Sequence, residues 1–304
     1  MKGWIIMNYY DEIKNELINN EIYKKVKDYS KNRSDLQTYY NVGKLLAEAG
    51  KLYGEGIIRE YSKKTTNELG KGYGLSNLKN MRKFYVLFSK SQAVPDQLTW
   101  SHYIELLKLK DMECINYYID ISIKLNLGYR QLRQKIKSNE YERLDENTKN
   151  KLITNNKCNS EIKDFIKHPI LIKNTLNYQE ISEKILKQLI LEDIPSFMKE
   201  LGNGFCFIDS EYKIKIGDRY NFIDLLLFNY IFNCFVIIEL KVNEIKAEYI
   251  GQIRKYMNYI DKKMKTINQD RTIGIIICKK DNHFIMEYCS DERVYRTTYE
   301  LINL

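Results

Sequence analysis

The sequence predicts two domains, an all-helical N-terminal domain over residues 1–145 and a C-terminal α/β domain over residues 161–304. Three observations support this division. Before residue 146, apolar side chains recur at helical spacing and form no strand pattern. Residues 146–160 are polar and rich in asparagine, which is typical of a linker. After them, amphipathic helical segments alternate with short apolar runs that suit buried strands, an order typical of α/β domains.

The expected N-terminal helices follow one another without a strand between them. Gly50, Gly70 and Gly128 predict where some of them end or are separated. The expected helical segments are 8–30, 34–50, 56–69, a helix capped by Ser76, the segment 98–110, 111–126 and 129–139.

The helix after Ser76 is a candidate for nucleic-acid recognition. Ser76 follows a glycine-rich turn and is a good N-cap, and apolar residues including Leu78 and Met81 share one face of the helix. A solvated basic face without a ligand is an equal alternative for the opposite side. The candidate nucleic-acid-binding residues, on that side and on a later basic helix, are Asn77, Lys79, Asn80, Arg82, Lys83, Arg130 and Arg133.

The net charge of +9 is unevenly distributed, since residues 1–145 contain 25 Lys and Arg against 18 Asp and Glu. This excess predicts contact with a polyanion, although abundant lysine, asparagine, isoleucine and tyrosine also fit an AT-rich genome. No apolar run approaches the roughly 20 residues that a membrane helix requires. The N-terminal MKGWIIM has too short an apolar segment for a secretory signal. We therefore expect a cytoplasmic protein without membrane contact.

The C-terminal half shows an alternation of helix and strand patterns. The six cysteines of the chain are scattered without a CxxC pair, so we expect neither a zinc site nor a disulfide framework. The expected elements are a helix over 178–200 with a break at Pro195, strands over 204–208 or beyond, 220–228 and 234–242, a helix over 246–264, a strand over 272–278, a helix over 283–289 and a strand over 294–299.

The stretch FIDLLLFNYIFNCFVIIELKV, residues 222–242, predicts a hairpin of two buried strands that turns around Asn229 to Asn233. If the pairing is symmetric about this turn, Asp224 lies opposite Glu239, and Lys241 shares their face. Two carboxylates that face each other in apolar strands repel, and a divalent cation between them would turn this cost into a binding site. A shift of one residue in register would instead place Asp224 on the other face.

The spacing of Asp224, then Glu239-Leu240-Lys241 at the end of an apolar strand, resembles the PD-(D/E)XK nuclease superfamily. The wider sequence resembles a bacterial family within it that joins an N-terminal helical domain of unknown function to a C-terminal PD-(D/E)XK nuclease domain. The resemblance implies a restriction-endonuclease-like αβββαβ core with a mixed sheet. The stretches that carry it are GYGLSNLKNMRKFY, LTWSHYIELLK, QLRQKIKSNEYERL, ELGNGFCF and IDLLLF with VIIELKVNEIKAEYIGQ.

The resemblance implies a role for each matching residue. Asp224 and Glu239 match the metal-binding carboxylates, and the backbone carbonyl of Leu240 is a further candidate ligand. Lys241 matches the lysine that orients or helps deprotonate the attacking water. Gln252 matches the polar residue on the following helix that supports the catalytic site. Such oxygen ligands suit Mg²⁺ or Mn²⁺.

One position departs from the superfamily pattern, and the identity of one further site residue stays open. Ile223 stands where the superfamily name would place proline, which many members also lack. The superfamily often carries a glutamate on its first helix, for which Glu183 and Glu192 are both candidates.

These observations predict a metal-dependent endonuclease that hydrolyses phosphodiester bonds of DNA, with the helical domain binding nucleic acid or a partner. The alternative is a catalytically inactive protein that retains the nuclease fold and binds nucleic acid or serves in assembly. Processing of RNA is a third class. Cutting both strands of a duplex favours a homodimer.

Overall fold

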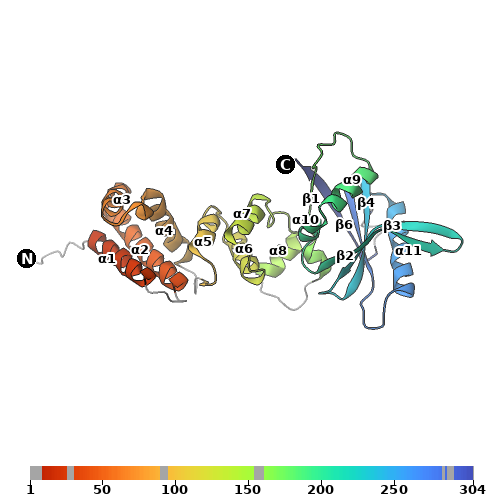
Figure 1. Cartoon of the computed structure of the whole chain (residues 1–304), viewed down its shortest axis with the longest axis horizontal. Helices are drawn as coiled ribbons and strands as arrows, with labels where there is room; N and C mark the ends of the chain where they lie inside the picture. The colour runs from red at the N-terminus through yellow and green to blue at the C-terminus, as the bar shows by residue number, and fades with distance from the viewer. Residues whose placement is uncertain are drawn as a thin grey trace, which may run out of the picture. The chain divides into compact units, whose positions relative to one another are not determined.

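The structure is a computed structural model that describes residues 9–25, 31–89, 95–153, 161–282, 285 and 291–303. Contacts divide the chain into two compact units, residues 1–141 and residues 142–304. Figure 1 shows helices in the first unit and a sheet with helices in the second.

The N-terminal unit is helical throughout its described residues, as the sequence predicts. Its helices α1, α2 and α3 pack around apolar side chains that include Ile13, Val42 and Leu46, all fully buried. The helices are α1 (Tyr9–Lys25), α2 (Lys31–Tyr53), α3 (Gly56–Leu69), the short 3₁₀ helix η1 (Lys71–Tyr73), α4 (Leu75–Phe88), α5 (Trp100–Leu106), α6 (Met112–Lys124) and α7 (Tyr129–Lys137).

Two expected helix boundaries are wrong. Helix α2 does not stop at Gly50 but continues to Tyr53, because Gly54, with φ of 78°, adopts the left-handed conformation that ends helices. Ser76 does not cap α4, because the carbonyl of Gly74 already accepts hydrogen bonds from the amides at positions 77 and 78. The helix therefore begins at Leu75, with Gly74 as its N-cap, two residues earlier than a cap at Ser76 would place it.

The C-terminal unit is built on a six-stranded mixed sheet. The strand order is β1-β6-β5-β4-β3-β2, in which β2, β3 and β4 are antiparallel neighbours and β4, β5, β6 and β1 are parallel. Its elements are α8 (Glu146–Ile153), η3 (Ile162–Phe165), β1 (Ile170–Lys173), α9 (Glu183–Glu192), α10 (Ile194–Leu201), β2 (Phe205–Ile216), β3 (Arg219–Asn229), β4 (Cys234–Glu244), α11 (Ala247–Lys263), β5 (Ile273–Lys280) and β6 (Val294–Ile302).

The predicted fold class is confirmed, since a helix, three strands, a helix and a strand follow in the expected αβββαβ order. Strand β1, which the sequence did not predict, has only four residues and pairs with β6 at the other end of the unit. The expected helix over 178–200 begins only at Glu183, and the break expected at Pro195 is confirmed, since α10 starts at Ile194. Asp193 separates α9 from α10 and accepts a hydrogen bond from the Ser196 amide at the start of α10.

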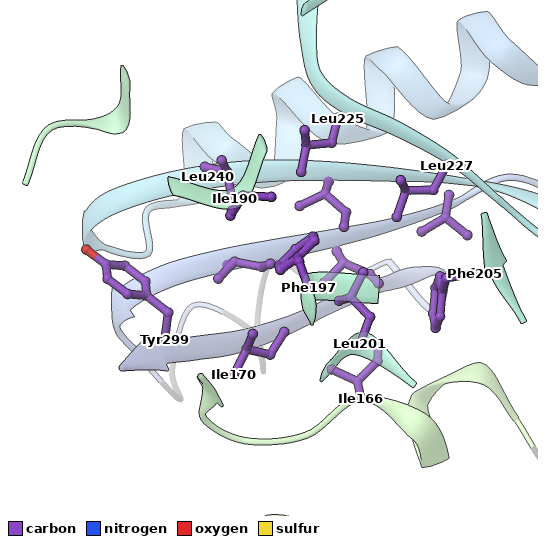
Figure 2. Close-up of a cluster of buried hydrophobic side chains, with 14 of the residues drawn as sticks. Ile166, Ile170, Ile190, Phe197, Leu201, Phe205, Leu225, Leu227, Leu240 and Tyr299 are labelled. Carbon is purple, nitrogen blue, oxygen red and sulfur yellow. The ribbon is translucent and has the colours of Figure 1, made fainter. Parts of the chain in front are cut away.

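Helices cover the two faces of the sheet. On one face, α11 packs against apolar residues such as Ile237 and Ile276. On the other, side chains of α9 and α10 face alternate residues of the same strands (Figure 2). The residues labelled in Figure 2 on this second face include Ile190, Phe197, Leu201, Leu225, Leu227 and Leu240. Because both faces are buried, the central strands are apolar along most of their length.

The segment expected as a linker begins with helix α8 instead. The Asp145 carboxylate accepts a hydrogen bond from the Asn147 amide at the start of this helix. Thr148 and Lys151 of the helix then bind the carboxylate of Asp164. Residues 154–160, and the expected helix over 283–289 except position 285, lie outside the described residues. Within the described part of the chain, no helix is long and apolar enough to cross a membrane.

Gly43 allows α2 and α4 to approach closely. A Cβ atom at this position would lie 2.2 Å from the carbonyl oxygen of Met81, a contact that backbone atoms cannot relieve by rotation. We therefore expect Gly43→Ala to destabilise the N-terminal unit by roughly 1–3 kcal/mol in urea unfolding followed by circular dichroism.

Gly50→Ala in the same helix is the matched control. Its added Cβ would meet only the Arg82 side chain at 3.6 Å or more, which is ordinary contact. Alanine there should leave stability unchanged or raise it by up to about 1 kcal/mol. Equal effects of the two substitutions would contradict the role given to Gly43.

Candidate active site

The predicted register of the β3–β4 hairpin is confirmed. Leu225 pairs with Ile238 and Asn229 pairs with Cys234, as pairing symmetric about the turn requires. Recorded pairing between the two strands ends at Leu225, whereas β3 stays paired with β2 as far as Arg219. The strands therefore part where Asp224 would next lie across from Glu239.

Asp224 occupies the point where the strands part. One carboxylate oxygen accepts a hydrogen bond of 3.0 Å from the backbone amide of Leu240 on β4. The other accepts one of 3.0 Å from the ammonium of Lys187 on α9. Asp224 is thus fixed by a neighbouring strand and by the helix above the sheet, with its side chain 18% exposed.

Glu239 is the most buried charged group of this cluster, with 2% of its side chain exposed. Its Oε2 atom accepts a hydrogen bond of 3.1 Å from the Gln252 amide. Its Oε1 atom is buried and has no hydrogen-bond partner among the described residues. Burial, followed by repulsion from Asp224, raises the pKa of Glu239 to about 8 from its ordinary value of 4.5.

Lys241 lies beside these carboxylates, as its place on the same strand face predicts. Its ammonium is 3.5 Å from Oε2 of Glu239 and 3.5 Å from Oε2 of Glu183, and it lies 5.2 Å from the centre of the Tyr249 ring. Burial lowers the pKa of Lys241, but attraction to Glu239, Glu183 and Asp224 outweighs it and raises the pKa above its ordinary value. Lys241 is therefore a cation at neutral pH in this structure.

Gln252 reaches the cluster from the opposite face of the sheet. It projects from α11, where its side-chain amide donates to Glu239 and contacts the Tyr256 hydroxyl at 3.1 Å. Asp224, Glu239, Lys241 and Gln252, all proposed from the sequence, are thus brought into one group that spans β3, β4 and α11.

Sequence reasoning missed Lys187 and did not choose between two glutamates. Lys187 connects Asp224 to Glu211 of β2, whose Oε1 lies 2.9 Å from the ammonium. Glu183, at the start of α9, contacts Lys241, whereas Glu192 at its end bonds to Thr175 and Gln188. In the sequence, Glu183 and Lys187 lie four positions apart, so a helix places them on one face. That spacing is the sequence signal that could have indicated that both point toward the cluster.

The residues present fit a hard divalent cation. Among the described residues, the buried Oε1 of Glu239 has no hydrogen-bond partner and lies beside a second carboxylate, and the raised pKa of Glu239 means that a nearby positive charge would favour its ionisation. The Leu240 amide points at Asp224, so in an extended strand the Leu240 carbonyl points to the same side. The described residues contain no group of three His, Cys, Asp or Glu suited to a metal. Two carboxylates and a carbonyl suit Mg²⁺, which keeps several waters and binds phosphate oxygens.

The residues expected to bind nucleic acid belong to the N-terminal unit, and several have partners within it. Arg82 pairs with Glu55, Lys83 binds the Leu107 carbonyl, and Arg133 bonds to Glu105 at 2.6 Å. The others lie nearer the surface or bond locally: Asn77 binds the Gly72 carbonyl, Arg130 contacts the Tyr129 ring, Asn80 is partly buried and Lys79 is exposed.

Two carboxylates at the end of a parted hairpin, followed by a lysine and flanked by a helix on each face, define a nuclease domain of the PD-(D/E)XK class. The comparisons with known proteins agree. A DUF1016 N-terminal domain matches residues 14–143, and the YhcG PDDEXK nuclease domain matches residues 163–301. The chain therefore carries a DUF1016 N-terminal domain followed by a YhcG PDDEXK nuclease domain, and the resemblance drawn from the sequence is confirmed.

Relatives and solved structures of this class are distant. "Putative nuclease YhcG" of Escherichia coli (strain K12) is 24% identical over 283 residues, which cover 79% of this chain and 76% of that protein. A repair endonuclease from Pyrococcus abyssi is 18% identical, with 42% of this chain and 49% of that chain covered and a TM-score of 0.29. An EndoMS–dsDNA complex is 17% identical over 42% and 48%, with a TM-score of 0.28. The chain spans about half the length of these two structures.

Replacing the buried carboxyl should change how stability depends on pH. Without metal, ionisation of Glu239 destabilises the fold progressively as pH rises from about 4.5 to about 8, because the folded pKa lies above the ordinary value. In EDTA, Glu239→Gln should match the parent near pH 5 and be more stable by at least ~1 kcal/mol near pH 8.5 in urea unfolding. A gap that does not widen with pH would contradict the raised pKa of Glu239.

The positive charge of Lys187 should oppose the binding of a cation at Asp224 and Glu239. Its ammonium lies 3.0 Å from Asp224, so Lys187→Gln removes a repulsion and should tighten Mg²⁺ binding several-fold in calorimetric titration. Lys262→Gln, at the distant end of α11, should have little effect. Weaker binding in Lys187→Gln would instead show that the lysine mainly holds Asp224 in position.

Proposed function

We propose that this protein is a metal-dependent endonuclease that hydrolyses phosphodiester bonds of DNA. The observation that carries the proposal is the buried, unpartnered oxygen of Glu239, held against Asp224 with Lys241 alongside. A buried pair of carboxylates destabilises a fold unless a cation neutralises it. A site that binds a cation and places an ammonium beside it is suited to reactions in which negative charge increases at a phosphate.

Each residue of the cluster has a distinct task in this proposal. Asp224, Glu239 and the Leu240 carbonyl hold Mg²⁺ or Mn²⁺, and the Leu240 amide fixes the orientation of Asp224. When bound, the metal lowers the pKa of water and neutralises charge on the scissile phosphate. Lys241, a cation in this structure, orients the attacking water and stabilises the additional charge on the phosphate. Gln252 keeps Glu239 in place.

The charge of the chain favours a nucleic acid as the substrate, and DNA is the class that we propose. The net charge is +9, and exposed basic side chains of the N-terminal unit, such as Lys79, could neutralise phosphates away from the cleavage site. In this proposal the helical unit contributes affinity and the C-terminal unit contributes the chemistry. A homodimer would place two such sites on the two strands of a duplex.

Cleavage of supercoiled plasmid by the full-length protein tests the proposal. The parent should nick or linearise DNA with Mg²⁺ or Mn²⁺ and not in EDTA. Asp224→Asn and Lys241→Gln should each lower the rate by about 100-fold or more, because each removes a group that acts on the reacting phosphate. Glu192→Gln, on α9 but away from the cluster, should cut like the parent.

The opposite results have clear meanings. If Asp224→Asn and Lys241→Gln cut as fast as the parent, the assigned site is wrong. If no metal supports cleavage while DNA still binds, the protein is a binding or assembly protein with a retained nuclease fold. If structured RNA is cleaved in preference to duplex DNA in competition, the substrate class is RNA.

A further inference from the structure

The end of the β2–β3 hairpin extends past the point where β4 stops pairing with β3, and Figure 1 shows this teal arm reaching beyond α11. We define the arm as residues 210–223. Its two strands stay paired from Ser210–Leu225 to Ile216–Arg219, and the chain turns at Gly217, with φ of 59°. The arm is therefore ordered sheet with two distinct faces.

The inner face of the arm is part of the apolar core. Ile214 and Ile223 are 1% and 0% exposed and pack with residues of α11 such as Ile253. This packing fixes the arm against the body of the C-terminal unit. The side chains of the outer face are held in place without being buried themselves.

The outer face carries aromatic and basic side chains in cross-strand pairs. Lys213 pairs with Phe222 and Lys215 pairs with Tyr220, so these four side chains lie on one side of the arm. Tyr220 and Phe222 are 57% and 54% exposed, an unusual state for two large rings on one small surface. The Lys213 ammonium lies 3.9 Å from the centre of the Tyr220 ring, which keeps positive charge over the aromatic surface.

This outer face leads directly to the candidate active site. Phe222 precedes Asp224 by two positions on β3, so their side chains lie on the same side of an extended strand. On the other strand of the arm, Glu211 accepts a hydrogen bond from the Lys187 ammonium of α9, which also donates to Asp224. A ligand on the outer face would therefore continue to Asp224, one of the proposed metal ligands, without crossing the sheet.

We propose that this outer face, formed by Lys213, Lys215, Tyr220 and Phe222, stacks unpaired bases of the DNA strand next to the scissile phosphate. The inference rests on the proposed function and deepens it, since it makes the substrate class DNA with single-stranded or distorted segments. Aromatic rings beside lysines are the means by which sheet surfaces hold single strands, through base stacking and phosphate contact. Bases of a regular duplex already stack on one another and offer no such face.

The charge of the face argues against a second copy of the chain as its occupant. A symmetric contact between two identical surfaces would place Lys213 and Lys215 of one copy against the same lysines of the other. Of the acidic residues beside the face, Glu211 and Asp224 are already paired with Lys187, and Asp218 lies in the turn of the arm. A polyanion with flat rings satisfies both the charge and the aromatic surface.

Binding measured in EDTA tests the proposal without requiring cleavage. Fluorescence anisotropy of the full-length protein would use labelled single-stranded DNA, a flap substrate and a blunt duplex. The double variant Tyr220→Ala/Phe222→Ala should bind the single strand and the flap at least about tenfold more weakly, and the duplex less than about threefold more weakly. Tyr230→Ala removes another exposed ring, at the opposite end of β3 with 65% exposure, and should bind like the parent.

A second variant separates stacking from charge. Lys213→Gln/Lys215→Gln should weaken binding to all three DNAs, and its affinity should depend less steeply on salt than that of the parent. Thermal unfolding should be unchanged in both double variants, because the substituted side chains are exposed.

Three results for the Tyr220→Ala/Phe222→Ala variant would overturn the proposal. The first is unchanged binding to single-stranded DNA, and the second is equal weakening of binding to the single strand and to the duplex. The third is loss of a dimer of the protein in sedimentation while DNA binding stays intact, which would make the face a contact between copies. Failure of the proposed nuclease function is distinguishable from these. If the parent cuts no DNA with any metal but shows the aromatic-dependent preference for single strands, the arm assignment stands and the catalytic one fails.

Discussion

The site depends on one electrostatic constraint, two carboxylates held together at the end of an apolar hairpin. Pairing of β3 with β4 ends at Leu225 and Ile238, so the Leu240 amide bonds to the Asp224 side chain. In the part of the chain that the structure describes, one Glu239 oxygen is buried without a hydrogen-bond partner. Repulsion between the two groups is the reason that the pKa of Glu239 rises beyond the effect of burial. Every other polar group of the cluster is arranged around this pair.

Helices on opposite faces of the sheet act on the pair in different ways. From one face, α9 brings the ammonium of Lys187 to Asp224. From the other, α11 brings the amide of Gln252 to Glu239. Their apolar sides are buried in separate clusters, so the positions of both polar groups are set by core packing. The hydrophobic core thus determines the distances on which the chemistry depends.

The hairpin and its site could be predicted from the sequence because a two-residue period and a central turn fix which side chains share a face. The contribution of Lys187 could not, since one lysine on an amphipathic helix carries no pattern that names its distant partner. The ion pairs Arg82–Glu55 and Arg133–Glu105 could not be predicted for the same reason, because their partners lie 27 and 28 positions apart in the sequence. The short strand β1 depends likewise on pairing with the far end of the chain.

On the side of β3 that carries Tyr220 and Phe222, exposure falls from these rings to the partly buried Asp224, and Leu225 and Leu227 beyond it are fully buried. Asp224 therefore stands at the boundary between solvent and core, open to ligands on one side and near a medium of low polarity on the other. Aromatic side chains are usually buried and carboxylates are usually exposed. This strand departs from that rule in two ways, because Tyr220 and Phe222 are exposed and Asp224 lies beside the buried Glu239. The proposed nucleic-acid strand and cation would account for both, because the bases would cover the rings and the cation would neutralise the acids.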